Sequence, residues 1–203
     1  ILAIGQVGRS ENAEIIVHHL KDEYWPARIA AADTLGNLGE VSAVIPLLEV
    51  LDDDDEDLAT SAIIALGKIG DERAVPGLIS TLQRESWTLK YQAIKILGEL
   101  RAARAFMDLV KLLDEDTLDL KPHIIRAIAS TNHQRCHEEL HRRFLREDEL
   151  EARLAYIEAL AQLGNPAVIP ELVKLSKPQN LWEERRLAIK GLGIMKALDA
   201  KPA

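Results

Sequence analysis

Small residues recur along this chain at intervals of 31 or 32 residues, and this spacing constrains the fold more than any other feature. We call these positions landmarks. They are Gly5, Gly36, Gly67, Gly98, Ala129, Ala161 and Gly193. A fixed period of about 20 to 50 residues is typical of repeat architectures, in which one unit cannot bury its apolar face alone and must stack on its neighbours. The period therefore predicts a solenoid.

Each repeat contains two predicted helices. The second helix ends at a pair of positions, the landmark and a second small or polar residue three positions later, such as Gly67 and Gly70. The segment that follows has apolar residues at helical spacing, as at Val75, Leu78 and Leu82. The fold class is therefore all-α, an α-α superhelix of about 6.5 helical hairpins of 31–32 residues. We expect residues 1–203 to form one solenoid domain. Because residues 1–8 have the pattern of a helix end, we also expect the sequence to be a fragment of a longer chain.

Composition narrows the classes of function. The chain is 47% hydrophobic and 29% charged, which suits a packed core. A net charge of -8 argues against general nucleic-acid binding, because neutralising phosphates needs a basic face. No apolar run reaches the roughly 18 residues of a spanning helix, and the single Cys136 fits a reducing compartment. We expect a cytoplasmic protein without a cofactor and without membrane contact.

The segment ALGKIGDERAVPGLISTL at residues 65–82 resembles the short HEAT repeats named after phycobilisome lyases, and the likeness extends over nearly the whole chain. The resemblance implies helical hairpins whose second helices line a concave, variable face. Similar proteins include lyase subunits for bilin attachment, an iron hydroxylase and plain interaction modules, and the fold alone does not choose among them. The repeated His-Glu pairs of the hydroxylase are absent, and residues 91–98 lack the aromatic-rich helix of the lyase subunits.

The landmarks also define a numbering within each second helix. Offsets -9, -5, -2, -1 and +2 from the landmark cluster on one side of a helical wheel and are mostly apolar or small, so we expect them to form the core. Offset -8 is basic in five of six repeats. These residues are Arg28, Lys90, Lys121, Arg153 and Arg185. We expect each to reach an acidic loop residue of a neighbouring repeat.

Offsets -11, -10, -7, -6 and -3 lie opposite the core, and they carry our candidate binding residues. All three tryptophans of the chain stand at offset -11, and Trp87, Tyr91 and Lys95 form an i, i+4, i+8 line. We name the candidate partner-binding residues the second-helix stripe. The stripe consists of Trp25, Ile29, Trp87, Tyr91, Lys95, Arg126, Leu154, Trp182, Arg186 and Lys190.

Two interpretations of the tryptophans stay open. They are anchors for a partner, since aromatic residues dominate interface hot spots, or they are staples that cover the loop before each helix. We favour a non-catalytic scaffold that binds a protein or peptide, with Arg126, Arg186 and Lys190 as a basic patch for an acidic, apolar partner. An accessory subunit of a cofactor-attaching enzyme, similar to a bilin lyase subunit, is the alternative. Uncapped terminal repeats, with Ile4, Leu192 and Met195 uncovered, offer a further contact surface.

The segment from His137 to His141 reads HEELH and matches the zinc-binding pattern HExxH, in which Glu138 would act as a general base. A metal-dependent hydrolase using these three residues is the least favoured alternative. In the repeat frame, His137 and His141 align with Val75 and Ile79, so we expect both histidines to face the interior of their repeat and to bind no metal.

Two other segments depart from the repeat pattern. The acidic run at residues 52–57 joins two helices, and we expect it to be a solvated helix cap rather than a calcium site. The repeat at residues 118–147 is the least regular, with a polar first helix and with Pro122 near the start of its second helix. We expect Pro122 to shorten the first turn of that helix, and we treat the irregularity as the mark of a candidate site.

Overall fold

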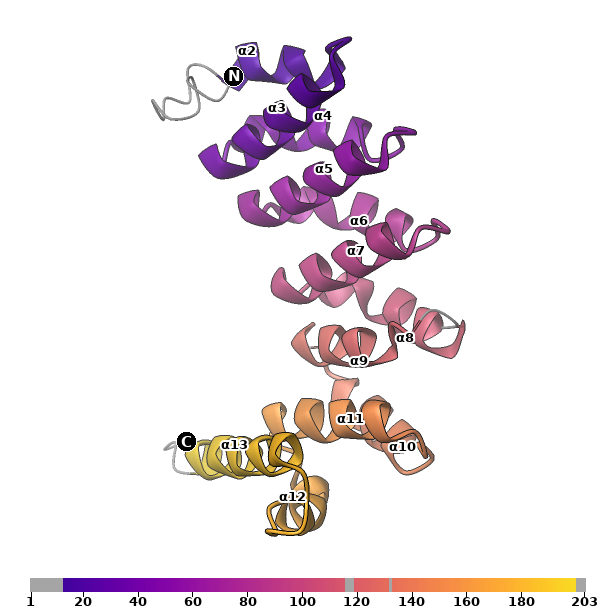
Figure 1. The fold of residues 1–203 in the computed structure, drawn as a ribbon, viewed down its shortest axis with the longest axis vertical. Coiled ribbons are helices and arrows are strands. Elements are labelled where there is room, and N and C mark those ends of the chain that lie inside the picture. Colours follow the sequence, from indigo (N-terminus) through magenta and orange to yellow (C-terminus); the bar gives the residue numbers. More distant parts are fainter. Residues whose placement is uncertain (1–12, 116–118, 132, 200–203) are drawn as a thin grey trace. The chain divides into compact units, whose positions relative to one another are not determined.

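The computed structural model describes residues 13–115, 119–131 and 133–199, and these ranges contain helices and connecting turns without a strand (Figure 1). The all-α prediction is therefore confirmed. The chain divides into two compact units, residues 1–108 and 109–203, which we describe separately. The expectations for residues 1–8, including the uncovered Ile4, lie outside the described residues. Within the described part, no helix is both long and apolar enough to cross a membrane.

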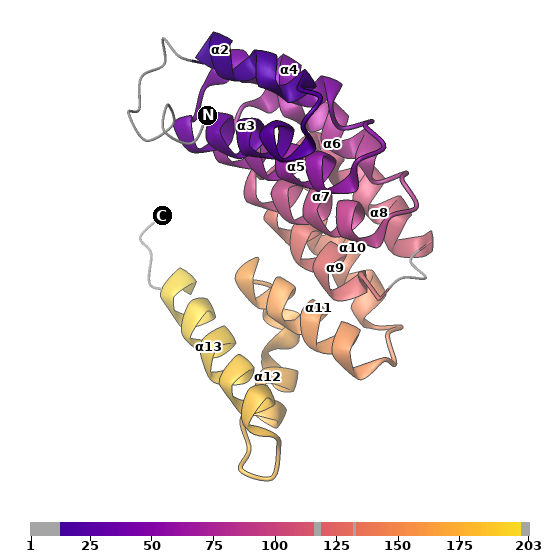
Figure 2. The same cartoon turned by 45° about the horizontal axis from the view of Figure 1, so that its top comes forward.

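The first unit alternates short and long helices. Their bounds are α2 Ala13–His18, α3 Trp25–Leu38, α4 Val44–Glu49, α5 Glu56–Ile69, α6 Val75–Thr81 and α7 Trp87–Glu99. The long helices α3, α5 and α7 are the second helices of their repeats and form one layer, and the short first helices form the other layer (Figures 1 and 2). This arrangement agrees with the two predicted helices per repeat.

Local sequence sets where the helices of the first unit begin and end. Helices α3 and α5 end at Gly39 and Gly70, whose φ angles of 66° and 73° lie in the left-handed region that favours glycine. The Asp55 carboxylate caps α5 by accepting hydrogen bonds from the backbone amides of Asp57 and Leu58. The acidic run is therefore a helix cap, as expected.

Close contact between successive second helices explains the landmarks. A Cβ atom added at Gly36 would lie 2.6 Å from the Cα of Ala65. One added at Gly67 would lie 2.4 Å from the Cδ1 of Ile96. Ala65 and Ile96 both stand at offset -2, so Gly36 and Gly67 each meet the -2 position of the next second helix. Small residues recur at these two landmarks because the helices touch there, whereas a Cβ atom added at Gly193 would meet nothing within 4 Å.

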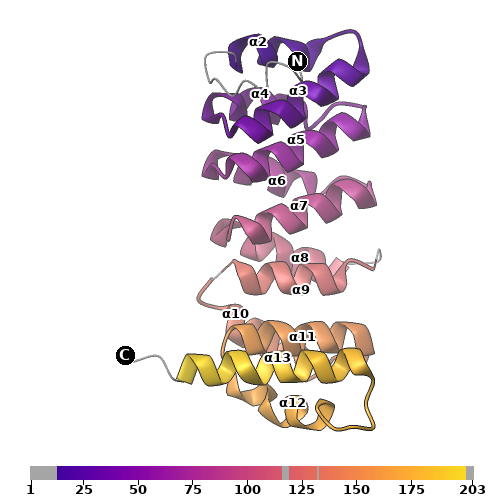
Figure 3. The same ribbon diagram turned by 60° about the vertical axis from the view of Figure 1, so that its left-hand side comes forward.

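The second unit repeats the same plan with less regular helices. Their bounds are α9 Lys121–Ser130, α10 Cys136–Phe144, α11 Leu150–Gln162, α12 Ile169–Leu175 and α13 Trp182–Asp199, and α8 Phe106–Glu115 contains the division between the units. Pro122 lies in the first turn of α9, which has 10 residues where α7 has 13. The predicted shortening is confirmed. Helix α13 lies beside α11 and α12 (Figure 3).

Burial follows the predicted core positions in most respects. Offsets -5 and -2 are buried in every second helix from α3 to α13. Offset -4 is not among the predicted core positions, yet it is buried from α3 to α11 and becomes exposed only in α13, where Ile189 is 65% exposed. The expectation for Met195 was wrong, since it is 8% exposed, and Leu192 is half-buried. Helix α13 thus leaves Ile189, rather than Met195, uncovered.

Candidate functional site

Basic residues at offset -8 link neighbouring repeats in three of five cases, twice through a loop residue as predicted and once through Glu171 of helix α12. Arg28 pairs with Asp53, Lys121 Nζ lies 3.1 Å from Glu149 Oε2, and Arg153 Nη2 lies 3.5 Å from Glu171 Oε1. Lys90 has no ion pair among the described residues. The Nε atom of Arg185 is buried in α13 without a hydrogen-bond partner there. These pairs hold successive hairpins together.

In the first unit, the second-helix stripe presents aromatic rings at the starts of α3 and α7. Trp25 and Trp87 are the first residues of these helices and are 56% and 47% exposed. The ring of Trp87 stacks on that of Tyr91, with 5.2 Å between centroids and 3° between planes. Lys95 follows one turn later and its Nζ lies 4.0 Å from Glu99 Oε1, while Ile29 is half-buried. Helix α7 therefore carries Trp87, Tyr91 and Lys95 in line.

In the second unit, four stripe residues meet in one groove between α9, α11 and α13. Its volume is about 390 Å³, and its lining includes Arg126, Leu154, Arg186 and Lys190. Three glutamates line it as well, at positions 151, 158 and 183. Because the Nε of Arg126 donates a 2.9 Å hydrogen bond to Glu158 Oε2, one of the three expected cations is already paired. The expected basic patch is thus a groove of mixed charge.

Trp182 extends the stripe to the beginning of α13. It is 62% exposed, and the guanidinium carbon of Arg186 lies 5.4 Å from the centroid of its ring, within cation–π range. Both residues line a further cavity of about 520 Å³ together with Ile189 and Lys190. Trp182 and Arg186 therefore form one surface with an exposed apolar side chain beside it.

The HEELH segment lies on α10, but its histidines do not point into the repeat as expected. His137 is exposed and His141 is half-buried, whereas Cys136 and Leu140 are buried. The buried residues Cys136, Leu140 and Phe144 match the buried Ala74, Leu78 and Leu82 of the equivalent repeat, so the two helices differ at His137, which is exposed where Val75 is buried. Among the described residues, no group of three or more His, Cys, Asp or Glu side chains is arranged to hold a metal ion.

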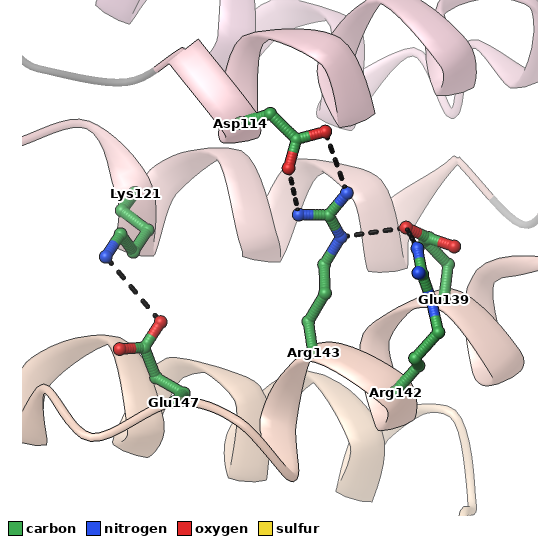
Figure 4. A network of polar contacts seen from close by, with 6 residues as sticks. All are labelled: Asp114, Lys121, Glu139, Arg142, Arg143 and Glu147. Carbon is green, nitrogen blue, oxygen red and sulfur yellow. Dashed lines mark hydrogen bonds and ion pairs between the residues drawn. The ribbon is translucent and has the colours of Figure 1, made fainter.

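Helix α10 carries a network of charged side chains that the repeat pattern did not predict (Figure 4). Arg143 donates two hydrogen bonds to Asp114, at 2.5 and 3.0 Å, and a third from Nε to Glu139 Oε1 at 2.8 Å. Arg142 donates to the same Glu139 oxygen at 2.6 Å. The Glu139 side chain is only 8% exposed, so its charge is balanced inside the protein rather than by water.

These ion pairs shift the titration of their members. The hydrogen bond from Arg143 lowers the pKa of Asp114. The hydrogen bonds to Asp114 and Glu139 raise the pKa of Arg143. Burial favours a higher pKa for Glu139, but hydrogen bonds from Arg143 and Arg142 outweigh it and lower the pKa. Contact with Glu149 and Glu147 raises the pKa of Lys121. All the groups are therefore held in their charged forms near neutral pH.

The repeat frame contains a signal for this network. Glu139 and Arg143 stand 62 residues, or two repeats, after Gly77 and Thr81. The position of Arg143 is uncharged in the other repeats, where Val50, Thr81, Leu112 and Leu175 occupy it, whereas the position of Glu139 is also acidic at Asp108 and Glu171. The polarity of this helix is plain in the sequence, but the repeat frame predicts the histidines, rather than Glu139 and Arg143, on the inward side.

Comparisons with known proteins agree with this architecture. The family model for HEAT repeats matches residues 1–66 and 46–129, and the model for the PBS lyase HEAT-like repeat matches residues 152–177. No curated protein sequence matches the chain.

Solved structures are similar over most of the length. A chain from the complex of CpcE and CpcF of phycocyanin lyase from Nostoc sp. PCC7120 is 27% identical, with a TM-score of 0.70 over 93% of this chain and 78% of that one. A designed armadillo repeat protein in complex with the peptide (KR)4 is 18% identical, with a TM-score of 0.61 over 89% of this chain and 98% of that one, and it shows the fold alone. The matched repeats cover more than half of the sequence, and the chain belongs to the HEAT-repeat family.

Proposed function

We propose that this chain is a non-catalytic scaffold that binds a protein or peptide through the second-helix stripe. The observation that carries the proposal is the exposure of all three tryptophans, between 47% and 62%, at the same offset of α3, α7 and α13. A ring that served only to cover a loop would be more deeply buried. Exposed aromatic side chains that recur on one helix face are typical of contact sites.

The chemistry of each unit suggests what it binds. In the first unit, the stacked rings of Trp87 and Tyr91 form a rigid aromatic surface that loses little conformational freedom on binding. In the second unit, Lys190 has no ion pair among the described residues, and Arg186 contacts an aromatic ring rather than a carboxylate. A segment with apolar and acidic side chains suits both surfaces, in line with the expectation from the sequence.

Selection from a random peptide library displayed on phage tests the proposal and does not require the natural partner to be identified. Peptides selected on the wild-type chain are expected to bind the double variant Trp87→Ala plus Tyr91→Ala at least tenfold more weakly, since aromatic anchors contribute about 2 kcal/mol or more each. Ile45→Ala is the matched control, because Ile45 is 51% exposed on the first helix α4. Equal binding of the selected peptides to the double variant and the control would reject the stripe.

An accessory role in cofactor attachment is the second candidate. It is supported by the 27% identity to a chain of the phycocyanin lyase complex over 93% of this sequence. If this chain handles a bilin, incubation of the purified protein with the free pigment is expected to shift the visible absorption band. A spectrum equal to the sum of the separate components would rule this candidate out.

A further inference from the structure

A polar cavity of about 440 Å³ lies in the second unit, apart from the second-helix stripe. Its lining residues are Leu113, Asp114, Lys121, Arg142, Arg143, Arg146, Glu147 and Tyr156. Four of these eight side chains are cationic and two are acidic, although the whole chain has a net charge of -8. The lining therefore holds two more cations than carboxylates, while Lys121, Arg142 and Arg143 also pair with Glu149 and Glu139 outside the lining. None of the lining residues belongs to the stripe.

Tyr156 is the unusual member of this lining. It stands at offset -5, where α3, α5, α7 and α13 all have alanine, so the fold itself does not require an aromatic ring there. The side chain is only 2% exposed, and its hydroxyl makes no hydrogen bond within the described part of the chain. Among the described residues only Nε of Arg185 is a fully buried side-chain polar atom without a partner, so the Tyr156 hydroxyl keeps access to the cavity that its side chain lines. The Tyr156 hydroxyl thus leaves a donor available at the cavity.

Arg146 is the second available donor. Its side chain is exposed and has no ion pair with any described residue. The other cations are held in place: Lys121 by Glu147 and Glu149, and Arg143 by Asp114 and Glu139 (Figure 4). These carboxylates orient Lys121 and Arg143 and balance their charges, whereas Arg146 keeps an unpaired guanidinium at the cavity.

We propose that this cavity binds a phosphate group, whose oxygens accept hydrogen bonds from the Tyr156 hydroxyl and the Arg146 guanidinium. Lys121 lines the same cavity from the beginning of α9, while Arg146 follows α10 and Tyr156 lies on α11, so donors come from three segments. A phosphate offers more acceptor oxygens than a carboxylate, and guanidinium groups bind it well. Burial raises the pKa of Tyr156, which keeps its hydroxyl protonated as a donor. The group comes from free phosphate or from a phosphorylated side chain.

Calorimetric titration of the whole chain with inorganic phosphate tests the site. We expect saturable binding of one phosphate per chain, weakened at least tenfold by Tyr156→Phe or Arg146→Gln. Arg135→Gln is the matched control, because Arg135 is an exposed arginine of the same unit outside the cavity, and it is expected to bind as the wild type does. Tyr156→Phe removes only the hydroxyl, and a thermal melt checks that each variant folds.

A second arm separates the two sources of the group. A peptide with phosphoserine that binds at least tenfold more tightly than inorganic phosphate would indicate a phosphorylated side chain, and equal affinities would indicate free phosphate; either result supports the site. No saturable binding of either probe, equal losses in Arg146→Gln and Arg135→Gln, or acetate binding as tightly as phosphate would overturn the proposal. Because the cavity and the stripe share no residue, this failure would leave the proposed scaffold function untouched.

Discussion

Helices α6 and α10 occupy equivalent positions two repeats apart, but their side chains at the same two positions interact in different ways. In α6, Gly77 and Thr81 are small residues, and Thr81 donates its hydroxyl hydrogen bond to the Gly77 carbonyl within the same helix. In α10 the equivalent residues are Glu139 and Arg143, which form an ion pair and connect to Asp114 near the end of α8. The comparison shows that an inward position of this repeat accepts a charge when a partner of opposite charge is supplied by the adjacent repeat.

The largest expected effect comes from removing one member of the pair in α10. Arg143→Met leaves Glu139 buried with Arg142 as its remaining described partner, and we expect a loss of about 3–5 kcal/mol in the free energy of unfolding, measured in urea. Thr81→Val, which keeps the shape at the equivalent position of α6, is expected to cost far less. Glu139→Gln combined with Arg143→Met should cost clearly less than the sum of the single changes. Additive costs would contradict coupling between the two side chains.

A smaller effect is expected at the landmarks that pack the first unit. Gly36→Ala places a methyl group against the backbone of Ala65, and we expect it to cost about 1–3 kcal/mol. Gly193 is the matched position in α13, where an added Cβ would meet no atom within 4 Å. Gly193→Ala is therefore expected to stabilise the helix by about 0.5–1 kcal/mol. Thermal unfolding of both variants measures the contrast, and two effects of the same sign would contradict the proposed origin of the period.

Acidification is expected to have the smallest effect and to act through the charged network. The pKa values of Asp114 and Glu139 are lowered in the folded chain, so their contribution to stability is complete above their unfolded pKa values, near pH 4, and is lost as pH falls through the lowered values. Urea unfolding at a series of pH values should show this loss in the wild type and a flatter dependence in Arg143→Met. An unchanged slope would mean that other carboxylates, such as Asp53, dominate.

Much of the fold could be predicted from the sequence because its determinants are local or periodic. The glycines at 36 and 67 recur where successive helices touch, and the apolar offsets recur because a helix buries one face. At offset -8 the sequence predicts the recurring basic residue but not its partner, because the three paired acidic residues stand 25, 28 and 18 residues further along the chain. The alignment of Trp87, Tyr91 and Lys95 on α7 also follows from helical spacing alone.

The charged cavity could not be predicted in this way. His137 is exposed at a position where the equivalent Val75 is buried, and Glu139 and Arg143 of the same helix are largely buried. The pairing of Arg126 with Glu158 likewise depends on side chains from two repeats that meet only in the packed structure. The acidic partners of Arg126 and Arg143 are Glu158 and Asp114, which lie about one repeat away in sequence, and several other acidic residues lie at similar separations.

By itself, the sequence determined the helical repeat, its landmarks and the helix face that carries the tryptophans, because each depends on spacing within one or two helices. The tertiary structure alone decided which charges are paired, which histidines are exposed and where the hydroxyl of Tyr156 is left without a partner among the described residues. These outcomes depend on the rotation of each helix and on contacts between repeats, and a periodic pattern does not specify either one.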